Sequence, residues 1–267
     1  MEIISPLSSP SLLLLYSLLL SAAAAAAASS GDDSTLVYAA CSNLKYDPNS
    51  PYQSNLNSLL ASFANAAALS TYSNFSSSFA GSVAPILGLY QCRSDLSLPD
   101  CASCVRSALP QLSALCPSAT AATLQLRACF LRYGNDSFLG RPDNSLAFKR
   151  CGPAATSDHT STMSDMALSS LAAPGEAVGP FRLGVAGHVR GAAQCVGDLS
   201  PEDCGTCLAD AVGQLRADCD DAESGDLYLG KCYARFWSGE GDDSSSAHRR
   251  WLYRALWLLS GVAVANI

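Results

Sequence analysis

The first helical pattern along the chain lies in residues 56–67. Its apolar positions recur at helical spacing and fall on one face: Leu56, Leu59, Leu60, Phe63 and Ala67. Ser54 precedes them as the expected N-cap. The pattern predicts an amphipathic helix, and we interpret its apolar stripe as core rather than as a groove for a partner.

A second and clearer helical pattern begins at Ser200. Ser200 and Pro201 are typical of the N-cap and first position of a helix, and Asp203 is spaced to complete a capping box. One continuous apolar stripe follows: Cys204, Cys207, Leu208, Ala211, Val212 and Leu215. Because two cysteines lie in this stripe, we expect the helix to bury them.

An equivalent helix is predicted about a hundred residues earlier, where Ser97 and Asp100 repeat the same spacing. Pro110 should kink or end that helix early, because proline lacks the backbone N–H and its ring clashes with the preceding turn. A shorter helix is predicted within the Ser/Ala-rich residues 158–179. Its weaker pattern leads us to expect that the second half of the chain is less well packed than the first.

Short runs of apolar or alternating residues predict strands: Val37–Ala40, Pro85–Tyr90, Cys129–Tyr133, Phe181–Val185 and Cys232–Phe236. In two of them apolar side chains alternate with Arg132 or Arg235, which indicates one wet face. Residues 146–150 run straight into Cys151 with no flexible linker. We therefore expect the two halves of the chain to be fixed against each other.

The cysteines form the same ladder twice. The first set is Cys41, Cys92, Cys101, Cys104, Cys116 and Cys129, and the second is Cys151, Cys195, Cys204, Cys207, Cys219 and Cys232. Only the first interval differs (51 against 44), and both copies contain a C-x8-C-x2-C cluster preceded by glutamine. Chance does not produce such agreement, and we interpret the ladder as an internal duplication.

Length, charge and the N-terminus narrow the class of protein. The 267 residues allow two domains of roughly 100 residues each. The net charge is −7, and the scattered Lys and Arg residues argue against a nucleic-acid partner. The apolar run Leu12–Leu20, followed by the alanines 22–28, resembles a secretory signal peptide cleaved between Ala28 and Asp32, although a retained membrane anchor is an alternative.

Three interpretations compete for the cysteines. A zinc site would need ligands from both C-x-x-C pairs, which lie in separate repeats, and would leave most cysteines unused. A redox dithiol would need an exposed position, whereas the helical stripe indicates burial. A disulfide framework uses all six cysteines of each repeat and fits an exported protein, so we favour it. Spacing alone does not choose the pairing.

Two sequence motifs mark possible glycosylation. Asn74-Phe75-Ser76 and Asn135-Asp136-Ser137 match the N-glycosylation sequon, so Asn74 and Asn135 are expected in surface loops of an exported chain.

The chain carries no recognisable catalytic constellation. His159, His188 and His248 are widely spaced and have no nucleophile motif beside them. Asp95 and Asp198 recur in the repeat, but each lies in a short loop between two cysteines, where Asp more often turns the backbone than transfers protons. We expect a protein that is not an enzyme and has no cofactor and no metal.

The cysteine modules and the signal peptide together resemble a known family. Two C-x8-C-x2-C modules behind a signal peptide resemble the plant cysteine-rich repeat secretory proteins, whose module is the stress-antifungal or ginkbilobin-homologous domain. A finer resemblance, to the plasmodesmata-located proteins, is carried by Tyr38–Ser42, residues 46–60, Cys129–Tyr133 and Lys231–Ser238. It covers roughly residues 36–241.

The resemblance implies an α+β fold with two tandem disulfide-rich modules, each with two helices packed on an antiparallel sheet of about five strands. With it we divide the chain into a signal peptide (1–30), a first module (34–150), a second module (151–241) and a polar linker with a short apolar segment (242–267). It also implies six bridges: Cys41–Cys116, Cys92–Cys101, Cys104–Cys129, Cys151–Cys219, Cys195–Cys204 and Cys207–Cys232.

Single-module antifungal members of the family bind mannose through an Asn, an Arg and a Glu. The positions at the same distances from the cysteines hold Ser42, Thr123 and Gly134 in the first module. In the second module they hold Gly152, Asp226 and Trp237. None of these matches, so the resemblance does not extend to that mannose site.

Plasmodesmata-located members have two modules outside the cell and one membrane span, and they limit traffic between plant cells. Here residues 251–267 are apolar but short, and Arg254 interrupts them, which indicates a marginal or truncated span. A secreted protein and a lipid-anchor signal are the alternatives.

We therefore expect a non-enzymatic cell-surface protein at plasmodesmata, with cell-surface proteins or cell-wall glycans as partners. Assembly of the chain into a homo- or hetero-oligomer is a further alternative. A secreted carbohydrate-binding defence protein in the apoplast is the alternative function.

Overall fold

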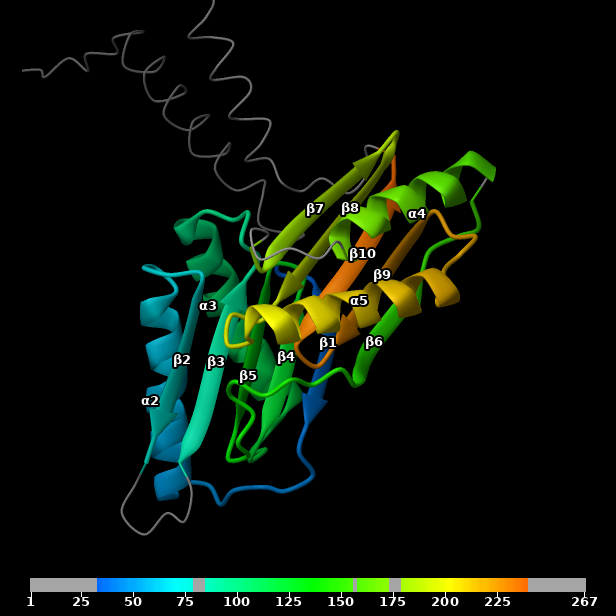
Figure 1. The fold of residues 1–267 in the computed structure, drawn as a ribbon. Coiled ribbons are helices and arrows are strands. Elements are labelled where there is room, and N and C mark those ends of the chain that lie inside the picture. The colour runs from blue at the N-terminus through cyan, green and yellow to red at the C-terminus, as the bar shows by residue number, and fades with distance from the viewer. Residues whose placement is uncertain (1–32, 79–84, 156–157, 173–178, 240–267) are drawn as a thin grey trace, which may run out of the picture.

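The computed structural model describes residues 33–78, 85–155, 158–172 and 179–239 (Figure 1). Within these residues the chain forms two modules, one after the other, and each is a five-stranded antiparallel sheet. Each module also has two helices, which pack against one face of its sheet (Figure 1). The predicted α+β fold with tandem modules is confirmed.

The elements of the first module are β1 (Leu36–Cys41), α2 (Pro51–Ala66), β2 (Tyr72–Ser77), β3 (Ile86–Cys92), α3 (Leu98–Leu115), β4 (Ala122–Leu126) and β5 (Cys129–Gly134). Those of the second are β6 (Leu146–Cys151), α4 (Asp158–Ala172), β7 (Phe181–Ala186), β8 (Val189–Cys195), α5 (Pro201–Asp218), β9 (Ser224–Leu229) and β10 (Cys232–Ser238). The strand orders are β1-β4-β5-β3-β2 and β6-β9-β10-β8-β7, which is the same order twice.

The helix starts follow their capping residues. The side-chain oxygens of Ser97 and Ser200 accept the backbone N–H groups three residues on, as the sequence predicts. The prediction for α2 is wrong: its N-cap is Ser50, and Ser54 lies inside the helix. Pro51 fits the first position because the N–H that proline lacks has no helical partner there.

Two further expectations concern the lengths of helices α3 and α4. Helix α3 continues through Pro110 to Leu115, because its last turns carry the buried Leu112 and lead into Cys116, which is disulfide-bonded. Tertiary packing outweighs the single backbone hydrogen bond that proline removes. Helix α4 has 15 residues against 16 in α2, so it is hardly shorter.

Strands β2, β4, β6, β8 and β9 were not predicted. Strand β2 reads as a polar, serine-rich loop because it is an edge strand with little apolar surface to bury. Strand β8 has an arginine and a glycine in its first half, which hide the alternating pattern. The register between strands is nevertheless continuous, with Phe181 opposite Gln194 and Tyr72 opposite Gln91.

Each module has its own core between helices and sheet. The first core contains several rings among its buried or half-buried side chains: Phe63, Phe75, Tyr90 and Tyr133. The second is built from smaller side chains, chiefly Ala, Val, Leu and Cys, with Phe236 as its aromatic member. Gly88 and Gly191 hold equivalent places, where a side chain would collide with Phe63 or crowd Leu171 of the covering helix.

Six disulfides pair all twelve cysteines. The pairs are those that the family resemblance implies, and corresponding bridges join corresponding elements of the two modules. No thiol is left for a zinc site or a redox dithiol.

Candidate functional site

The modules meet through the faces of their sheets that the helices leave bare. Gln91 and Gln194, which precede the first cysteine of each cluster, make reciprocal contacts there. The side-chain oxygen of Gln91 accepts the backbone N–H of Gly197 (2.9 Å), and that of Gln194 accepts the N–H of Ser94 (3.2 Å). Each glutamine thus holds the cysteine loop of the other module, and the duplication produces a pseudo-symmetric interface.

A cluster of rings extends this interface. Tyr38 of β1 stacks on Phe148 of β6 with centroids 6.3 Å apart, and both meet Tyr228. Tyr228 in turn lies 5.2 Å from Tyr233. Burial raises the pKa of Tyr228 to about 12 and also raises the pKa of Tyr233. The cavity around the two glutamines measures about 30 Å³, so the two modules pack closely at this part of the interface.

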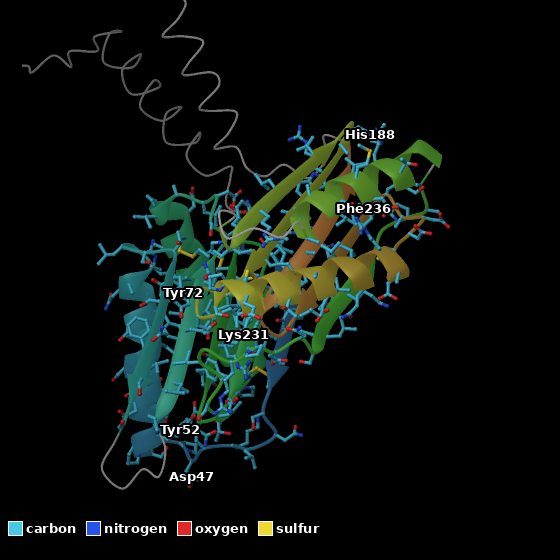
Figure 2. The ribbon with its side chains drawn as sticks, viewed as in Figure 1. Asp47, Tyr52, Tyr72, His188, Lys231 and Phe236 are labelled. Atoms are coloured by element: carbon cyan, nitrogen blue, oxygen red, sulfur yellow. A yellow bond between two sulfur atoms is a disulfide. The ribbon has the colours of Figure 1, made fainter. Side chains whose placement is uncertain are left out.

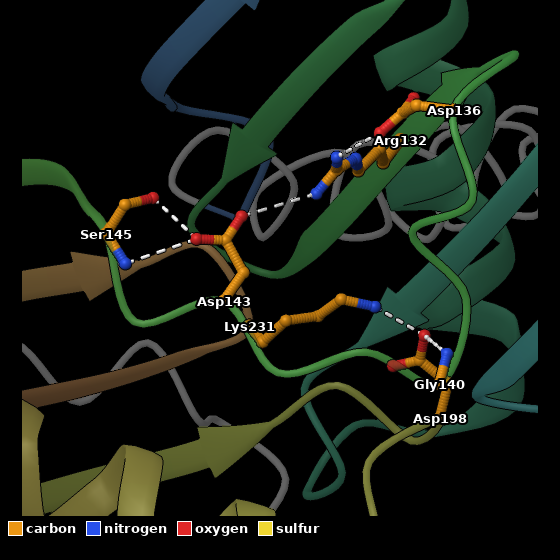
Figure 3. A network of polar contacts seen from close by, with 7 residues as sticks. All are labelled: Arg132, Asp136, Gly140, Asp143, Ser145, Asp198 and Lys231. Atoms are coloured by element: carbon orange, nitrogen blue, oxygen red, sulfur yellow. Dashed lines mark hydrogen bonds and ion pairs between the residues drawn. The ribbon is translucent and has the colours of Figure 1, made fainter.

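One buried ion pair breaks the pseudo-symmetry. Lys231 is 1% exposed, and its ammonium group donates to the carboxylate of Asp198, which also accepts the backbone N–H of Gly140 (Figure 3). The corresponding aspartate in the first module, Asp95, pairs with Arg93 instead (2.7 Å). Both recurrent aspartates are therefore held in ion pairs. Burial lowers the pKa of Lys231, and the Asp198 carboxylate opposes this shift.

The segment 135–145, which joins the modules, covers part of the bare face of the first sheet. We call it the connector. Its Phe138 is 4% exposed and lies with its ring centroid 4.3 Å from the guanidinium carbon of Arg132. Asp136 and Asp143 of the connector pair with the same guanidinium at 3.0 and 3.7 Å (Figure 3). Arg132 is therefore enclosed by the chain itself.

Arg235 occupies the same place in the second module, three residues after the last cysteine. Its Nε lies 3.0 Å from Asp226, and the other oxygen of Asp226 lies 2.9 Å from Arg150. Trp237 follows on the same strand face, with its ring centroid 5.2 Å from the Arg235 guanidinium. The first module has Thr123, Ala40 and Gly134 at the positions of Asp226, Arg150 and Trp237.

These residues line a cavity of about 260 Å³, which we call the boundary cleft. Its charged and aromatic lining residues are Arg127, Arg150, Glu223, Asp226, Arg235, Phe236 and Trp237. A smaller cavity of about 60 Å³ continues it, and Arg127 and Arg150 line both. Arg127 belongs to the turn between β4 and β5, so the cleft is built from both modules.

The cleft combines fixed and adaptable groups. Asp226 is held by two guanidinium groups, whereas the side chain of Arg150 is 60% exposed at the rim. The indole Nε1 of Trp237 is buried and makes no hydrogen bond within the described part of the chain. Such a site can bind a polar ligand through charge-assisted hydrogen bonds and one aromatic surface.

The structure places the positions compared with the mannose site differently in the two modules. Asp226 and Trp237 line the boundary cleft, and Gly152 lies beside it, where its backbone N–H donates to Ser224. In the first module Ser42, Thr123 and Gly134 lie at the ends of β1, β4 and β5 and bring no charged group.

The histidines lie in different elements of the chain, and only the side chain of His188 is among those that the structure describes. His159 lies in α4, and His188 lies in the turn between β7 and β8, 3.4 Å from the Thr160 hydroxyl. Figure 2 places His188 at the end of the molecule away from Tyr52 and Asp47. His248, the predicted signal peptide and the apolar residues 251–267 lie outside the described residues.

Both sequon asparagines are exposed. Asn135 lies in the loop after β5, as predicted, whereas Asn74 lies on the edge strand β2 rather than in a loop. Its side-chain nitrogen donates to the hydroxyl of Tyr72 at 2.9 Å.

Sequence reasoning missed Lys231, Arg127 and the two glutamines as parts of an interface. The glutamine before the first cysteine of each cluster is repeated in the sequence. Its role could not be read there, because its hydrogen-bond partner lies in the other module. No sequence pattern marked Arg127 and Arg150 as parts of one site. They belong to different repeats and line the same cavity only because the two modules pack together.

The comparisons with known proteins agree with this architecture. A family model described as "Salt stress response/antifungal" matches residues 40–136 and 151–238, which are the two cysteine-rich modules. The chain belongs to this family.

Relatives within the salt stress response/antifungal family share the tandem arrangement. Plasmodesmata-located protein 6 of Arabidopsis thaliana is 48% identical over 207 residues, which span 76% of this chain and 71% of that protein. The tandem DUF26 ectodomains of the Arabidopsis thaliana cysteine-rich receptor-like proteins PDLP5 and PDLP8 are 41% and 39% identical. Each superposes with a TM-score of 0.72 over 77% of this chain and covers 100% or 98% of the solved ectodomain.

These family members are plasmodesmata-located proteins and receptor-like ectodomains rather than known enzymes. Among the residues that the structure describes, no helix has both the length and the apolar character of a membrane span.

Proposed function

We propose that this protein acts outside the cell at plasmodesmata and regulates traffic between cells without catalysing a reaction. The observation that carries the proposal is the similarity to plasmodesmata-located protein 6, which extends across both modules. The two PDLP ectodomains support it, because they match the complete tandem unit rather than one module.

The chemistry of the described residues supports a binding role. All twelve cysteines are in disulfides, and the recurrent Asp95 and Asp198 are engaged in ion pairs. The interface between the modules is closely packed, so the pair presents one continuous surface to partners. Contacts with cell-surface proteins or cell-wall glycans would then regulate the channel through binding alone.

Localisation tests the proposal directly. A fluorescent protein is inserted after Gly31, upstream of the residues that bond to the β4–β5 turn, where Arg127 donates to Thr35 and Ala128 to Asp33. The fusion is expressed in leaf cells and imaged after plasmolysis. We expect paired puncta that stay in the wall at plasmodesmata, and reduced spread of a free fluorescent reporter into neighbouring cells.

The same fluorescent protein secreted without the two modules is the control and should spread evenly in the wall space. If the fusion behaves like this control and leaves reporter movement unchanged, the proposed function is wrong.

A further inference from the structure

The boundary cleft is a place where the second module has chemistry that the first lacks. At the equivalent positions of the first module, Arg132 lies under Phe138 and between the carboxylates of the connector. In the second module Arg235 forms the floor of a cavity of about 260 Å³. Within the described residues no segment plays the part of the connector there.

The charges of the cleft favour an anion. Among the lining residues, Arg127, Arg150 and Arg235 carry guanidinium groups, and Glu223 and Asp226 carry carboxylates. This local excess of positive charge occurs on a chain whose net charge is −7. Guanidinium groups bind carboxylates through paired hydrogen bonds, and a partly enclosed site strengthens such contacts relative to water.

The shape and the aromatic residue narrow the ligand further. A cavity of this size admits one or two ring units rather than a protein domain. Trp237 supplies an apolar surface beside the charges and an indole N–H that makes no hydrogen bond within the described chain. A pyranose ring has apolar C–H faces and many hydroxyl groups, so it matches an indole bordered by charged hydrogen-bonding groups.

We infer that the boundary cleft binds a carboxylate-bearing saccharide of the uronate class. Arg150 and Arg127 take the carboxylate at the module boundary, Trp237 supports the ring, and the Asp226–Arg235 pair forms a fixed floor that accepts and donates hydrogen bonds. The site needs both modules, because Arg127 comes from the first and the other groups from the second. This inference rests on the proposed function, for which it names a glycan contact in the wall.

Titration calorimetry on the full chain, produced by secretion, tests the inference with trigalacturonic acid as the probe. Its methyl ester is the matched neutral probe. We expect the acid to bind and the ester to bind at least about tenfold more weakly, with affinity for the acid falling as salt rises from 50 to 500 mM. Equal binding of acid and ester, or no binding of the acid at millimolar concentration, would overturn the inference.

Two variants locate the site. Arg150→Gln removes an exposed guanidinium from the rim and should weaken binding of the acid about tenfold. Arg106→Gln makes the same change on the exposed surface of α3, away from the cleft, and should leave binding unchanged. Equal losses in the two variants would show non-specific attraction and contradict the assignment.

An acidic peptide is the competing ligand. If a Glu-rich peptide binds and depends on Arg150 while trigalacturonic acid does not bind, the cleft is a protein site and the saccharide assignment is wrong. These outcomes are independent of imaging: a protein that localises to plasmodesmata without binding the acid refutes only this inference, and one that binds the acid without localising refutes only the proposed function.

Discussion

Arg132 and Arg235 hold the same place in the two modules and have different surroundings. The chain encloses Arg132 with Phe138, Asp136 and Asp143, whereas Arg235 lies at the base of the boundary cleft beside Trp237. The two modules have equivalent helix-free sheet faces. The connector covers part of this face in the first module. The comparison teaches that the connector covers this face in the first module, whereas the equivalent face of the second module borders a cavity.

The cores differ in the same direction. Rings fill much of the first core, whereas the second relies on small aliphatic side chains and the disulfides. The edge strands also differ: β2 carries the sequon at Asn74, whereas β7 exposes Leu183 and Val185, at 64% and 70%. Smaller side chains bury less apolar surface per residue, so we expect the second module to depend more on its bridges.

The largest effect should come from separating Lys231 and Asp198, the buried pair that only the second module has. Lys231→Ala copies the residue of the first module at this position, Ala128, but leaves the carboxylate of Asp198 buried without its cation. We expect a loss of about 3–5 kcal/mol in the free energy of unfolding, measured by chemical denaturation.

The double variant Lys231→Ala with Asp198→Asn removes both charges and should recover much of this loss. If the double variant is as unstable as Lys231→Ala alone, the buried charge is not the cause.

A matched pair of disulfide variants compares the two cores. Cys104–Cys129 and Cys207–Cys232 each close a loop with a sequence separation of 25, so the loop-closure entropy is the same. Replacing either pair with alanine should cost about 2–5 kcal/mol. We expect the second-module variant to be secreted in lower yield, because its core has less other packing.

Secretion yield and thermal melting of the two variants decide the question. Equal yields, or a lower yield for the first-module variant, would mean that the size of the core side chains does not set the dependence on disulfides.

A smaller effect should come from Tyr233 in the ring cluster between the modules. Its hydroxyl is buried and has no hydrogen-bond partner in the described chain, so Tyr233→Phe should raise the free energy of unfolding by about 1 kcal/mol at pH 8. Burial raises the pKa of Tyr233 above its ordinary 10.0. Between pH 10 and the folded pKa the unfolded chain binds fewer protons than the folded one, so stability falls as pH rises.

Denaturation curves at several pH values between 9 and 11.5 test this sign. The advantage of Tyr233→Phe should be constant below pH 10 and should grow above it by up to about 1.4 kcal/mol per pH unit. An advantage that does not grow above pH 10 would show that Tyr233 ionises as easily in the folded protein as in the unfolded chain.

Much of the fold could be predicted because its signals are local or repeated. Ser97 and Ser200 mark two helix starts, and the cysteine ladder marks the duplication. The expected early end of α3 at Pro110 is not found. The lost backbone hydrogen bond can be read from the sequence, whereas the burial of Leu112 that offsets it depends on tertiary packing. Strand β2 was missed because an edge strand needs little apolar pattern.

The candidate site could be predicted only in part. Asp226 and Trp237 were named because they lie at the same distances from the cysteines as mannose-binding residues of the family. Neither has the side chain that those family members have there. The cleft forms because Arg127 of the first module lies next to residues of the second. Gln91 and Gln194 each bind a loop of the other module, and these hydrogen bonds hold the two modules in that position. Such contacts between repeats leave no spacing pattern in the sequence.

The most direct test compares the boundary cleft with the exposed surface of α3 in living tissue. The full chain is expressed with Arg150→Gln or with Arg106→Gln, and the spread of a free fluorescent reporter between leaf cells is measured alongside localisation. We expect both variants to reach plasmodesmata. Arg106→Gln should restrict the reporter as the unmodified protein does, and Arg150→Gln should restrict it much less. Equal restriction by the two variants would contradict the claim that the boundary cleft of the second module is the functional face.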